Sequence, residues 1–360
     1  MPNNDSFYAS RADAKQKLED YQGAIDDFTK AIEIDPNNAD SYYRRGYAKE
    51  ELEKYQNAID DYTKAIQIDP NNADYYYRRG FIETILEDFQ VAIDDFSKAI
   101  EFDVYFSSAY LSRGVCKNKQ GKYKNAIDDF SKAIEINPKD ADVFVFRANS
   151  KDELKDFQGA IDDYTKAIEI DPNNARSLFL RGEKRFAIEK YQEAIDDFTK
   201  AIEINPNFCL TPNDFYAYTY RGFAEYKLKD YQGAIDDFTK SIEIDPNYIN
   251  SLFLRGTARY EIEKYQEAIY DLTKVLEIDP NSFDIDYLLG KCKRKLYEYK
   301  EAVDDLTKLL EMNPNDVNTL LLRASAKRKL GDNKGACADW KKASELGSEE
   351  AAELLKKHCE

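Results

Sequence analysis

Apolar residues recur along this chain at intervals of three and four residues, which is the spacing of one face of an α-helix. Within residues 39–72 a helix that begins at Tyr55 carries such a face, formed by Ala58, Ile59, Tyr62, Ala65 and Ile66. Asp69 precedes Pro70 and is pushed out of the helical region of the backbone, so this helix ends there. Residues 42–48 predict a preceding helix, and Asn71 or Asn72 offers a capping oxygen to the next one.

The whole pattern repeats every 34 residues. Its clearest marker is a proline after Asp or Asn, found at Pro36, Pro70, Pro138, Pro172, Pro206, Pro246, Pro280 and Pro314. Successive prolines lie 34 or twice 34 residues apart, except for one interval of 40 after Pro206, and Val104 occupies the place of a missing one. A phase kept over this length indicates a repeat architecture. We number ten repeats, which begin at residues 5, 39, 73, 107, 141, 175, 215, 249, 283 and 317.

Each predicted hairpin has a small residue in the middle of both helices. In the first helix it is Gly46, Gly80, Gly114, Gly182, Gly222, Gly256 or Gly290, with Ala12, Ala148 and Ala324 in the remaining repeats; in the second helix it is always Ala. A mid-helix glycine costs roughly 1 kcal/mol relative to alanine, so seven in register need a packing reason. We expect the two helices to nest there, with large residues such as Phe28 and Trp340 completing the core.

An aromatic or Leu, then Gly or Ala, then Ala, an aromatic and Pro over 34 residues resembles the tetratricopeptide repeat. The resemblance runs from about residue 5 to 348, and Leu272, Leu306 and Asp286 are its mild departures in repeats eight and nine. It implies an all-α fold, a right-handed superhelical α-solenoid of ten helix-turn-helix hairpins. Pentatricopeptide arrays, which read RNA, are the main alternative, but the period, the proline and the acidic balance count against them.

The expected organisation has four parts. Repeats one to six occupy 5–206, an inserted loop 207–214, repeats seven to ten 215–348, and a C-terminal capping helix 349–360. A tolerated insertion is the favoured interpretation of the loop; a change of superhelical pitch or a ligand contact is the alternative. Residues 1–4, Met-Pro-Asn-Asn, echo the Asp-Pro-Asn-Asn of residues 35–38, so we expect the first repeat to begin at a repeat boundary without a cap of its own.

Charge and composition narrow the classes of partner. The chain has 52 Lys and Arg against 69 Asp and Glu, a net charge of −17, and residues 281–360 are neutral, so the first 280 residues hold the whole excess. Nucleic acid and anionic membrane surfaces both require basic residues, and we expect neither as a partner. No secretory signal or membrane-spanning run is present, and five scattered cysteines are expected to be reduced thiols in the cytoplasm.

The recurring charged residues favour structure over catalysis. An Asp–Asp pair occupies the same place in eight second helices, whereas a catalytic site is needed once; its second Asp is present in all ten repeats. An Arg precedes the small first-helix residue in nine, and we predict that this Arg and Asp form an ion pair. His358 is the only histidine, no Gly-rich phosphate loop is present, and Cys116 and Cys292 are expected core thiols. We therefore predict no enzyme, no metal site and no cofactor.

The candidate binding surface is a stripe on the first helices. In the tetratricopeptide family the second, fifth, ninth and twelfth places of each repeat face a concave groove, and the resemblance implies the same here. The candidate residues are Tyr43, Tyr47, Tyr77, Phe81, Phe179, Tyr216, Phe223, Tyr226, Phe253, Tyr260, Tyr287, Lys291, Arg294, Lys295 and Arg328. A row of exposed aromatic residues is well suited to binding another protein. Packing of these rings between neighbouring first helices is the alternative, and the Lys/Asn/Arg carboxylate clamp of some relatives is missing.

These observations predict a non-enzymatic scaffold or adaptor that binds a peptide or partner protein in an aromatic-lined groove. The alternative is a structural protein that assembles with itself, end to end or as a homo-oligomer, through the open first repeat.

Overall fold

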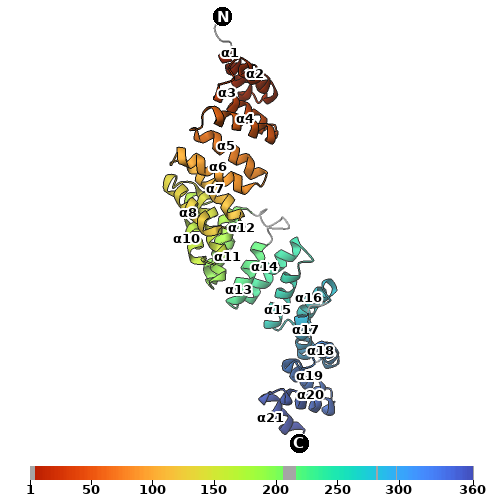
Figure 1. The fold of residues 1–360 in the computed structure, drawn as a ribbon. Helices are drawn as coiled ribbons and strands as arrows, with labels where there is room; N and C mark the ends of the chain where they lie inside the picture. The colour runs from red at the N-terminus through yellow and green to blue at the C-terminus, as the bar shows by residue number, and fades with distance from the viewer. Residues whose placement is uncertain (1–4, 206–215, 281–282, 297, 360) are drawn as a thin grey trace. The chain divides into compact units, whose positions relative to one another are not determined.

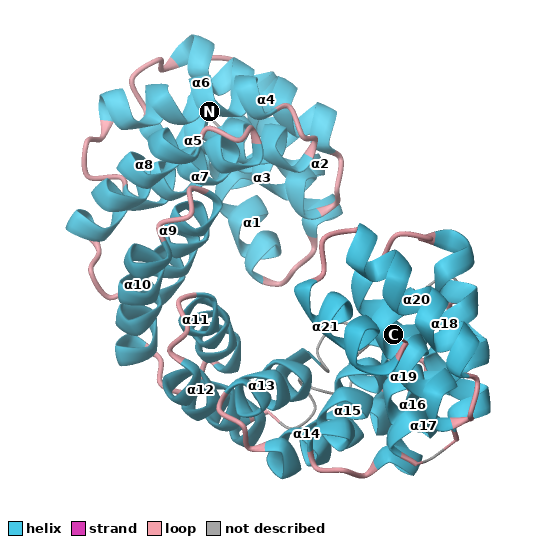
Figure 2. Cartoon of the chain, turned by 90° about the horizontal axis from the view of Figure 1, so that it is seen from below, coloured by secondary structure: helices cyan, strands magenta, loops and turns pink. Residues whose placement is uncertain are grey.

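The computed structural model describes residues 5–205, 216–280, 283–296 and 298–359, and within these ranges every regular element is a helix (Figures 1 and 2). The expected insertion at 207–214 and the start of the chain at residues 1–4 lie outside the described residues. The chain divides into two compact units, residues 1–173 with helices α1–α10 and residues 174–360 with helices α11–α21.

The helices form the ten predicted hairpins. The first helices are α1 (Asp5–Lys17), α3 (Ala39–Glu51), α5 (Ala73–Ile85), α7 (Ser107–Lys119), α9 (Ala141–Glu153), α11 (Ala175–Ala187), α13 (Tyr216–Lys227), α15 (Ile249–Glu261), α17 (Phe283–Lys295) and α19 (Val317–Lys329). The second helices are α2 (Tyr21–Ile34), α4 (Tyr55–Ile68), α6 (Phe89–Phe102), α8 (Tyr123–Ile136), α10 (Phe157–Ile170), α12 (Tyr191–Ile204), α14 (Tyr231–Ile244), α16 (Tyr265–Ile278), α18 (Tyr299–Met312) and α20 (Asn333–Glu345). Within each unit a helix packs mainly on its neighbours in sequence, which confirms an α-solenoid of helical hairpins.

The Asp-Pro and Asn residues between repeats end one helix and cap the next, as the sequence predicts. α4 stops at Ile68 before Asp69, and the Asn72 side chain accepts a hydrogen bond from the Asp74 N–H at the start of α5. Nine of the hairpins have a left-handed residue in the turn between their two helices. Seven turns use a non-glycine residue there, with φ between 55° and 65°: Glu19, Glu53, Glu87, Lys155, Glu189, Lys229 and Glu263; Gly121 and Gly331 serve in two others.

The mid-helix glycines have the packing reason that their repetition predicts. A Cβ on Gly46 would lie 2.8 Å from the Tyr62 ring, and one on Gly114 would lie 2.6 Å from the Phe130 ring. Both rings are fully buried. The nearest partner of these two glycines is therefore a second-helix aromatic ring, whereas the sequence pattern predicted the second-helix alanine.

The predicted Arg–Asp pair is confirmed in all nine repeats that carry the Arg. Nε and Nη2 of each guanidinium donate to the two carboxylate oxygens at 2.6–3.0 Å, in the pairs Arg11–Asp27, Arg45–Asp61, Arg79–Asp95, Arg113–Asp129, Arg147–Asp163, Arg181–Asp197, Arg221–Asp237, Arg255–Asp271 and Arg323–Asp339. These aspartates are buried, so the pairs differ from exposed surface pairs, which add little stability. In repeat nine, where Leu289 replaces the Arg, Lys293 binds Asp305 at 2.6 Å.

The same arginines also join neighbouring repeats. Arg45 Nη1 donates to the Thr29 hydroxyl of the preceding repeat at 3.1 Å, and Arg79, Arg113, Arg147, Arg221, Arg255 and Arg323 make the equivalent bond to a Thr or Ser. One guanidinium therefore closes its own hairpin and bonds to the previous one.

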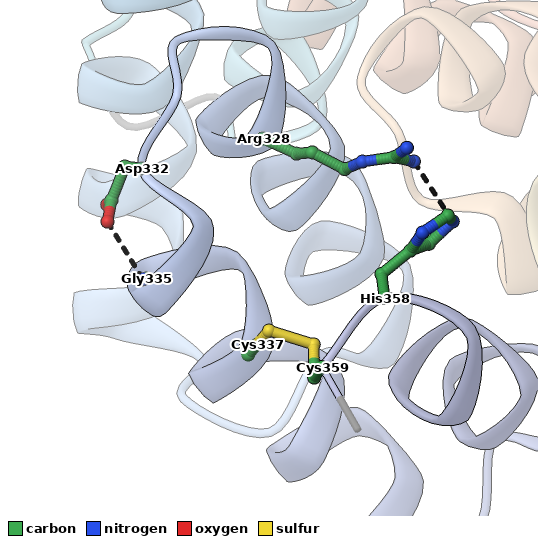
Figure 3. The surroundings of a disulfide bond; sticks show 6 residues. All are labelled: Arg328, Asp332, Gly335, Cys337, His358 and Cys359. Carbon is green, nitrogen blue, oxygen red and sulfur yellow. Dashed lines mark hydrogen bonds between the residues drawn. A yellow bond between two sulfur atoms is a disulfide. The ribbon is translucent and has the colours of Figure 1, made fainter.

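Helix α21 (Glu349–His358) packs on α20 and is fastened to it covalently. Cys337 of α20 and Cys359, directly after α21, form a disulfide (Figure 3). The prediction that all five cysteines are reduced thiols is wrong for this pair, because the last helix folds back and brings together residues 22 apart in sequence. Cys116 and Cys292 are free and buried, as predicted for core thiols; Cys209 lies outside the described residues.

Candidate functional site

The candidate aromatic residues of the first unit are largely in contact with other rings or cations. Tyr43 of α3 is half-buried, and its ring centroid lies 5.8 Å from that of Tyr62 and 5.0 Å from that of Tyr75. Tyr47, one turn further along α3, has the Arg78 guanidinium 4.9 Å from its ring centroid. Their outer faces remain partly accessible, since both residues are half-buried.

The next first helix, α5, shows both kinds of environment. Tyr77 lies between two rings, 5.7 Å from Phe96 and 4.8 Å from Phe106. Phe81, one turn further on, is 38% exposed, which is unusual for a phenylalanine. Packing between helices therefore accounts for part of the surface of Tyr77, whereas Phe81 offers its ring to solvent.

In the second unit three candidate residues line one cavity, which we call the aromatic pocket. It has a volume of about 470 Å³ and is lined by Tyr216, Thr219, Tyr220, Phe223, Tyr248, Asn250, Phe253 and Leu254. The lining comes from α13, from α15 and from Tyr248 just before α15. The pocket combines aromatic walls with a few hydroxyl and amide groups, which is the usual composition of a ligand site.

The other aromatic candidates of the second unit outside the two pockets lie on α11, α13 and α15. The Phe179 ring of α11 lies 5.6 Å from Phe198. Tyr226 and Tyr260 each make an edge contact with the first aromatic residue of the following helix, at 5.3 and 5.6 Å. They are half-buried.

A second cavity, which we call the basic pocket, lies at the C-terminal end of the second unit. Its volume is about 400 Å³, and it is lined by Tyr287, Arg294, Asn318, Leu321, Leu322, Ser325, Arg328, Lys329, Trp340, Glu350 and Leu354. These residues belong to α17, α19, α20 and α21. Lys295 lines an adjoining cavity of about 220 Å³ together with Arg294 and Lys329. The structure thus brings Tyr287, Arg294 and Arg328 together, with Lys295 beside them.

Two cations in and near this pocket contact ring side chains. Lys291 Nζ lies 4.6 Å from the ring centroid of Tyr260 and 5.7 Å from that of Tyr287, within the range of cation–π attraction. Arg328 is hydrogen-bonded to the His358 ring at 3.1 Å (Figure 3). Desolvation, and then the charge of Arg328, lower the pKa of His358, so the ring is neutral at pH 7 and accepts this bond.

Sequence reasoning missed several lining residues. Tyr220 and Tyr248 stand outside the four groove places, yet they form walls of the aromatic pocket. Trp340 is 2% exposed, as expected for a core residue, but it also lines the basic pocket, and α21 supplies Glu350 and Leu354 there. The apolar face of residues 349–358 was the only available signal, and it predicted a cap without showing which groups the cap would meet.

Two further observations concern other kinds of site. In the described ranges no group of three or more His, Cys, Asp or Glu side chains is placed to hold a metal ion. None of the helices that the structure describes combines the length and apolar character needed to cross a bilayer.

Known proteins resemble this chain in repeat pattern and in fold. Models of the tetratricopeptide repeat match residues 39–72, 107–140, 141–174, 175–208, 215–248, 250–282 and 287–316, and a TPR repeat model matches residues 12–53. A comparison with curated protein sequences gives no match.

Among solved structures, the C-terminal part of a TPR repeat-containing protein from Cytophaga hutchinsonii is 21% identical, with a TM-score of 0.60 over 68% of this chain and 97% of that one. YrrB, described as a TPR protein with an unusual peptide-binding site, is 26% identical, with a TM-score of 0.48 over 53% and 95%. MamA is 24% identical, with a TM-score of 0.46 over 49% and 96%. The repeat matches, which together cover most of the chain, show that this protein belongs to the tetratricopeptide repeat family.

Proposed function

We propose that this protein is a non-enzymatic adaptor that binds a segment of a partner protein along its first helices, with the aromatic pocket as the main anchor site. The observation that carries the proposal is the cavity of about 470 Å³ in which Tyr216, Phe223 and Phe253 meet. Membership of a family of protein-interaction repeats supports the same class of function.

The chemistry of the pocket indicates which part of a ligand it would hold. Its rings offer a large apolar area, while Thr219 and Asn250 offer polar atoms at the wall. An apolar or aromatic side chain of the partner would bury both its own surface and that of the rings. Such central aromatic anchors cost on the order of 2 kcal/mol or more when truncated. The remaining candidates, from Tyr43 to Tyr260, would then add surface along the path of the ligand.

The test begins with capture of partners by the purified full chain and identification by mass spectrometry. Binding of the captured partner is then measured by titration with wild type, Tyr216→Ala and Phe253→Ala. We expect at least a tenfold loss of affinity for each variant. Tyr270→Ala is the matched control, because Tyr270 is 66% exposed on a second helix, α16, and does not line the pocket. Wild-type affinity for both pocket variants would contradict the proposal.

The self-assembling alternative gives a different result in solution. End-to-end association through the first repeat would increase the average mass with concentration in light scattering. Phe7 of α1 is 56% exposed and would be covered in such a contact, so Phe7→Ser would reverse the increase. A mass that stays at one chain over a hundredfold range of concentration favours the adaptor.

A further inference from the structure

We propose that the basic pocket binds the phosphoryl group of a phosphorylated serine or threonine side chain. The proposal deepens the adaptor function and rests on it for the source of the ligand, since the phosphorylated residue would belong to the bound partner. The recognition chemistry itself depends only on residues of α17, α19, α20 and α21.

The first observation is a pair of buried donors. Arg294 Nε and Trp340 Nε1 are buried and have no hydrogen-bond partner within the described part of the chain, and both residues line the basic pocket. Leaving a buried N–H without an acceptor is unfavourable, because the group has lost its bond to water. An acceptor that enters the pocket would remove this cost. The indole N–H is a donor only, so only a hydrogen-bond acceptor can satisfy it.

The second observation is a difference between two faces of the same helix. Arg323 and Lys327 of α19 both bind the buried Asp339. Arg328 and Lys329, the next two residues, turn to the pocket instead, and no ion pair with an acid is found for them or for Arg294 among the described residues. In the described ranges the hydrogen bond of Arg328 goes to the neutral ring of His358. The pocket therefore holds three cations that structural ion pairs do not neutralise.

These features suit a phosphoryl group better than a carboxylate. A phosphate monoester carries close to two negative charges at pH 7 and three acceptor oxygens, whereas a carboxylate has one charge and two oxygens. Two guanidinium groups, an ammonium group and an indole N–H can all be satisfied by the former. Asn318 and Ser325 add further donors to the wall. The volume of about 400 Å³ also exceeds the needs of a lone carboxylate.

One acidic residue opposes the ligand. Glu350 of α21 lines the pocket and is exposed, and no cation of the pocket is paired with it within the described residues. It would repel a dianion across solvent, a weak effect that salt screens. Glu350→Gln should therefore increase phosphoryl affinity about twofold, which a purely structural role of these residues would not produce.

The experiment uses the only tryptophan of the chain as a reporter. The full chain, ¹⁵N-labelled at Trp340, is titrated with N-acetyl-phosphoserine amide, with N-acetyl-glutamate amide and with inorganic phosphate, and the indole N–H resonance is followed by NMR. We expect the phosphoserine derivative to shift this resonance and to bind at least tenfold more tightly than the glutamate derivative. Arg328→Gln and Lys329→Gln should each weaken binding about tenfold, whereas Lys341→Gln on the exposed side of α20 should leave it unchanged.

Each other outcome has a defined meaning. Equal affinity for phosphoserine and glutamate derivatives, or an indole resonance that does not respond, would overturn the phosphoryl assignment and leave the adaptor proposal intact. Tighter binding of inorganic phosphate than of the phosphoserine derivative would overturn the assignment to a protein side chain. The two proposals can also fail separately. If Phe253→Ala binds the phosphoserine derivative like wild type, and no captured partner loses affinity in the aromatic-pocket variants, the adaptor proposal is rejected and the phosphoryl assignment of the basic pocket stands.

Discussion

Repeats two and seven share the same Arg–Asp pair but differ in the residue one turn further along the first helix. In repeat two this residue is Lys49, whose Nζ lies 2.7 Å from the Asp61 carboxylate that Arg45 already binds. In repeat seven it is Glu225, which adds a negative charge beside Asp237. Eight repeats have a cation at this place, bound to the same Asp: Lys15, Lys49, Lys117, Lys151, Arg185, Arg259, Lys293 and Lys327. Only repeats three and seven have a glutamate.

The difference between the repeats changes the pKa values of the carboxyl groups in the hairpin. Burial, and next the charge of Asp237, raise the pKa of Glu225 to about 7. Burial likewise raises the pKa of Asp237, in spite of its bond to Arg221. Glu83 in repeat three has a raised pKa as well, with burial as the first cause. The second cation is therefore dispensable for the hairpin, but its replacement by Glu places an unfavourable charge in a half-buried position.

Removal of the Arg should have the largest effect, and more so where no second cation remains. Arg79→Leu would leave Asp95 buried with no cation bound to it among the described residues, and we expect a loss of about 3 kcal/mol in local stability. Arg45→Leu should cost less, because Lys49 continues to bind Asp61. Amide hydrogen exchange in α5 and α6, against α3 and α4, measures both losses separately.

The control for this comparison is Asp94→Asn, since Asp94 is exposed and adjacent to the buried Asp95. Its exchange rates should remain those of wild type. If Arg79→Leu and Arg45→Leu reduce the protection of amide hydrogens from exchange equally, the second cation contributes nothing to stability. The sequence difference between the repeats would then have no energetic effect.

The Glu225 carboxyl should make repeat seven sensitive to pH. Its folded-state pKa lies above the ordinary value of 4.5, so the folded state binds more protons, and stability decreases as the pH rises from about 4.5 through 7. Because solvent screens a half-buried charge, we expect a loss of about 1 kcal/mol between pH 5.5 and 8. Hydrogen exchange of α13 and α14 at the two pH values tests this.

Two substitutions sharpen the same measurement. Glu225→Gln should abolish this pH dependence, and Glu225→Lys should stabilise the repeat at pH 8 by restoring the cation of the other repeats. An unchanged pH profile in Glu225→Gln would assign the effect to another group.

Loss of the second cation alone should have the smallest effect. In repeat four, Lys117→Gln leaves Asp129 bound by Nε and Nη2 of Arg113, so we expect a loss of stability below about 1 kcal/mol. Urea denaturation of the full chain with hydrogen exchange of α7 and α8 provides the value. A loss as large as that of Arg113→Leu would mean that the two cations act as one unit.

The repeated features could be predicted from the sequence because ten copies report on one structure. The 34-residue period gave the hairpins, and the Arg and Asp at fixed places gave their ion pair. The burial of Asp61 or Asp95 could not be predicted in this way, because the spacing of residues in the sequence does not give the solvent exposure of a side chain. The bonds from arginines to Thr29 and its equivalents were also missed, because a hydroxyl on a polar helix face has no distinct signal in sequence.

The features that occur once were harder to predict. The Cys337–Cys359 disulfide depends on the direction in which α21 returns over α20, and no periodic signal specifies that direction. The basic cluster of Arg294, Lys295 and Arg328 was visible in the sequence, but the contribution of Trp340 to the same pocket was not. The role of the candidate groove residues in binding stays a prediction.

The bond that seven of these arginines make to the hydroxyl of the preceding repeat has a consequence for the history of such chains. Nearly every junction in the described structure uses the same guanidinium and a Thr or Ser in the same place. If one 34-residue segment were deleted in frame, the arginine of the following repeat would meet an equivalent hydroxyl and form the same bond. A duplication would likewise create a junction that is already chemically complete. Genes for such arrays can therefore gain or lose whole repeats by unequal recombination, and selection can adjust the length of the binding surface without first repairing the fold.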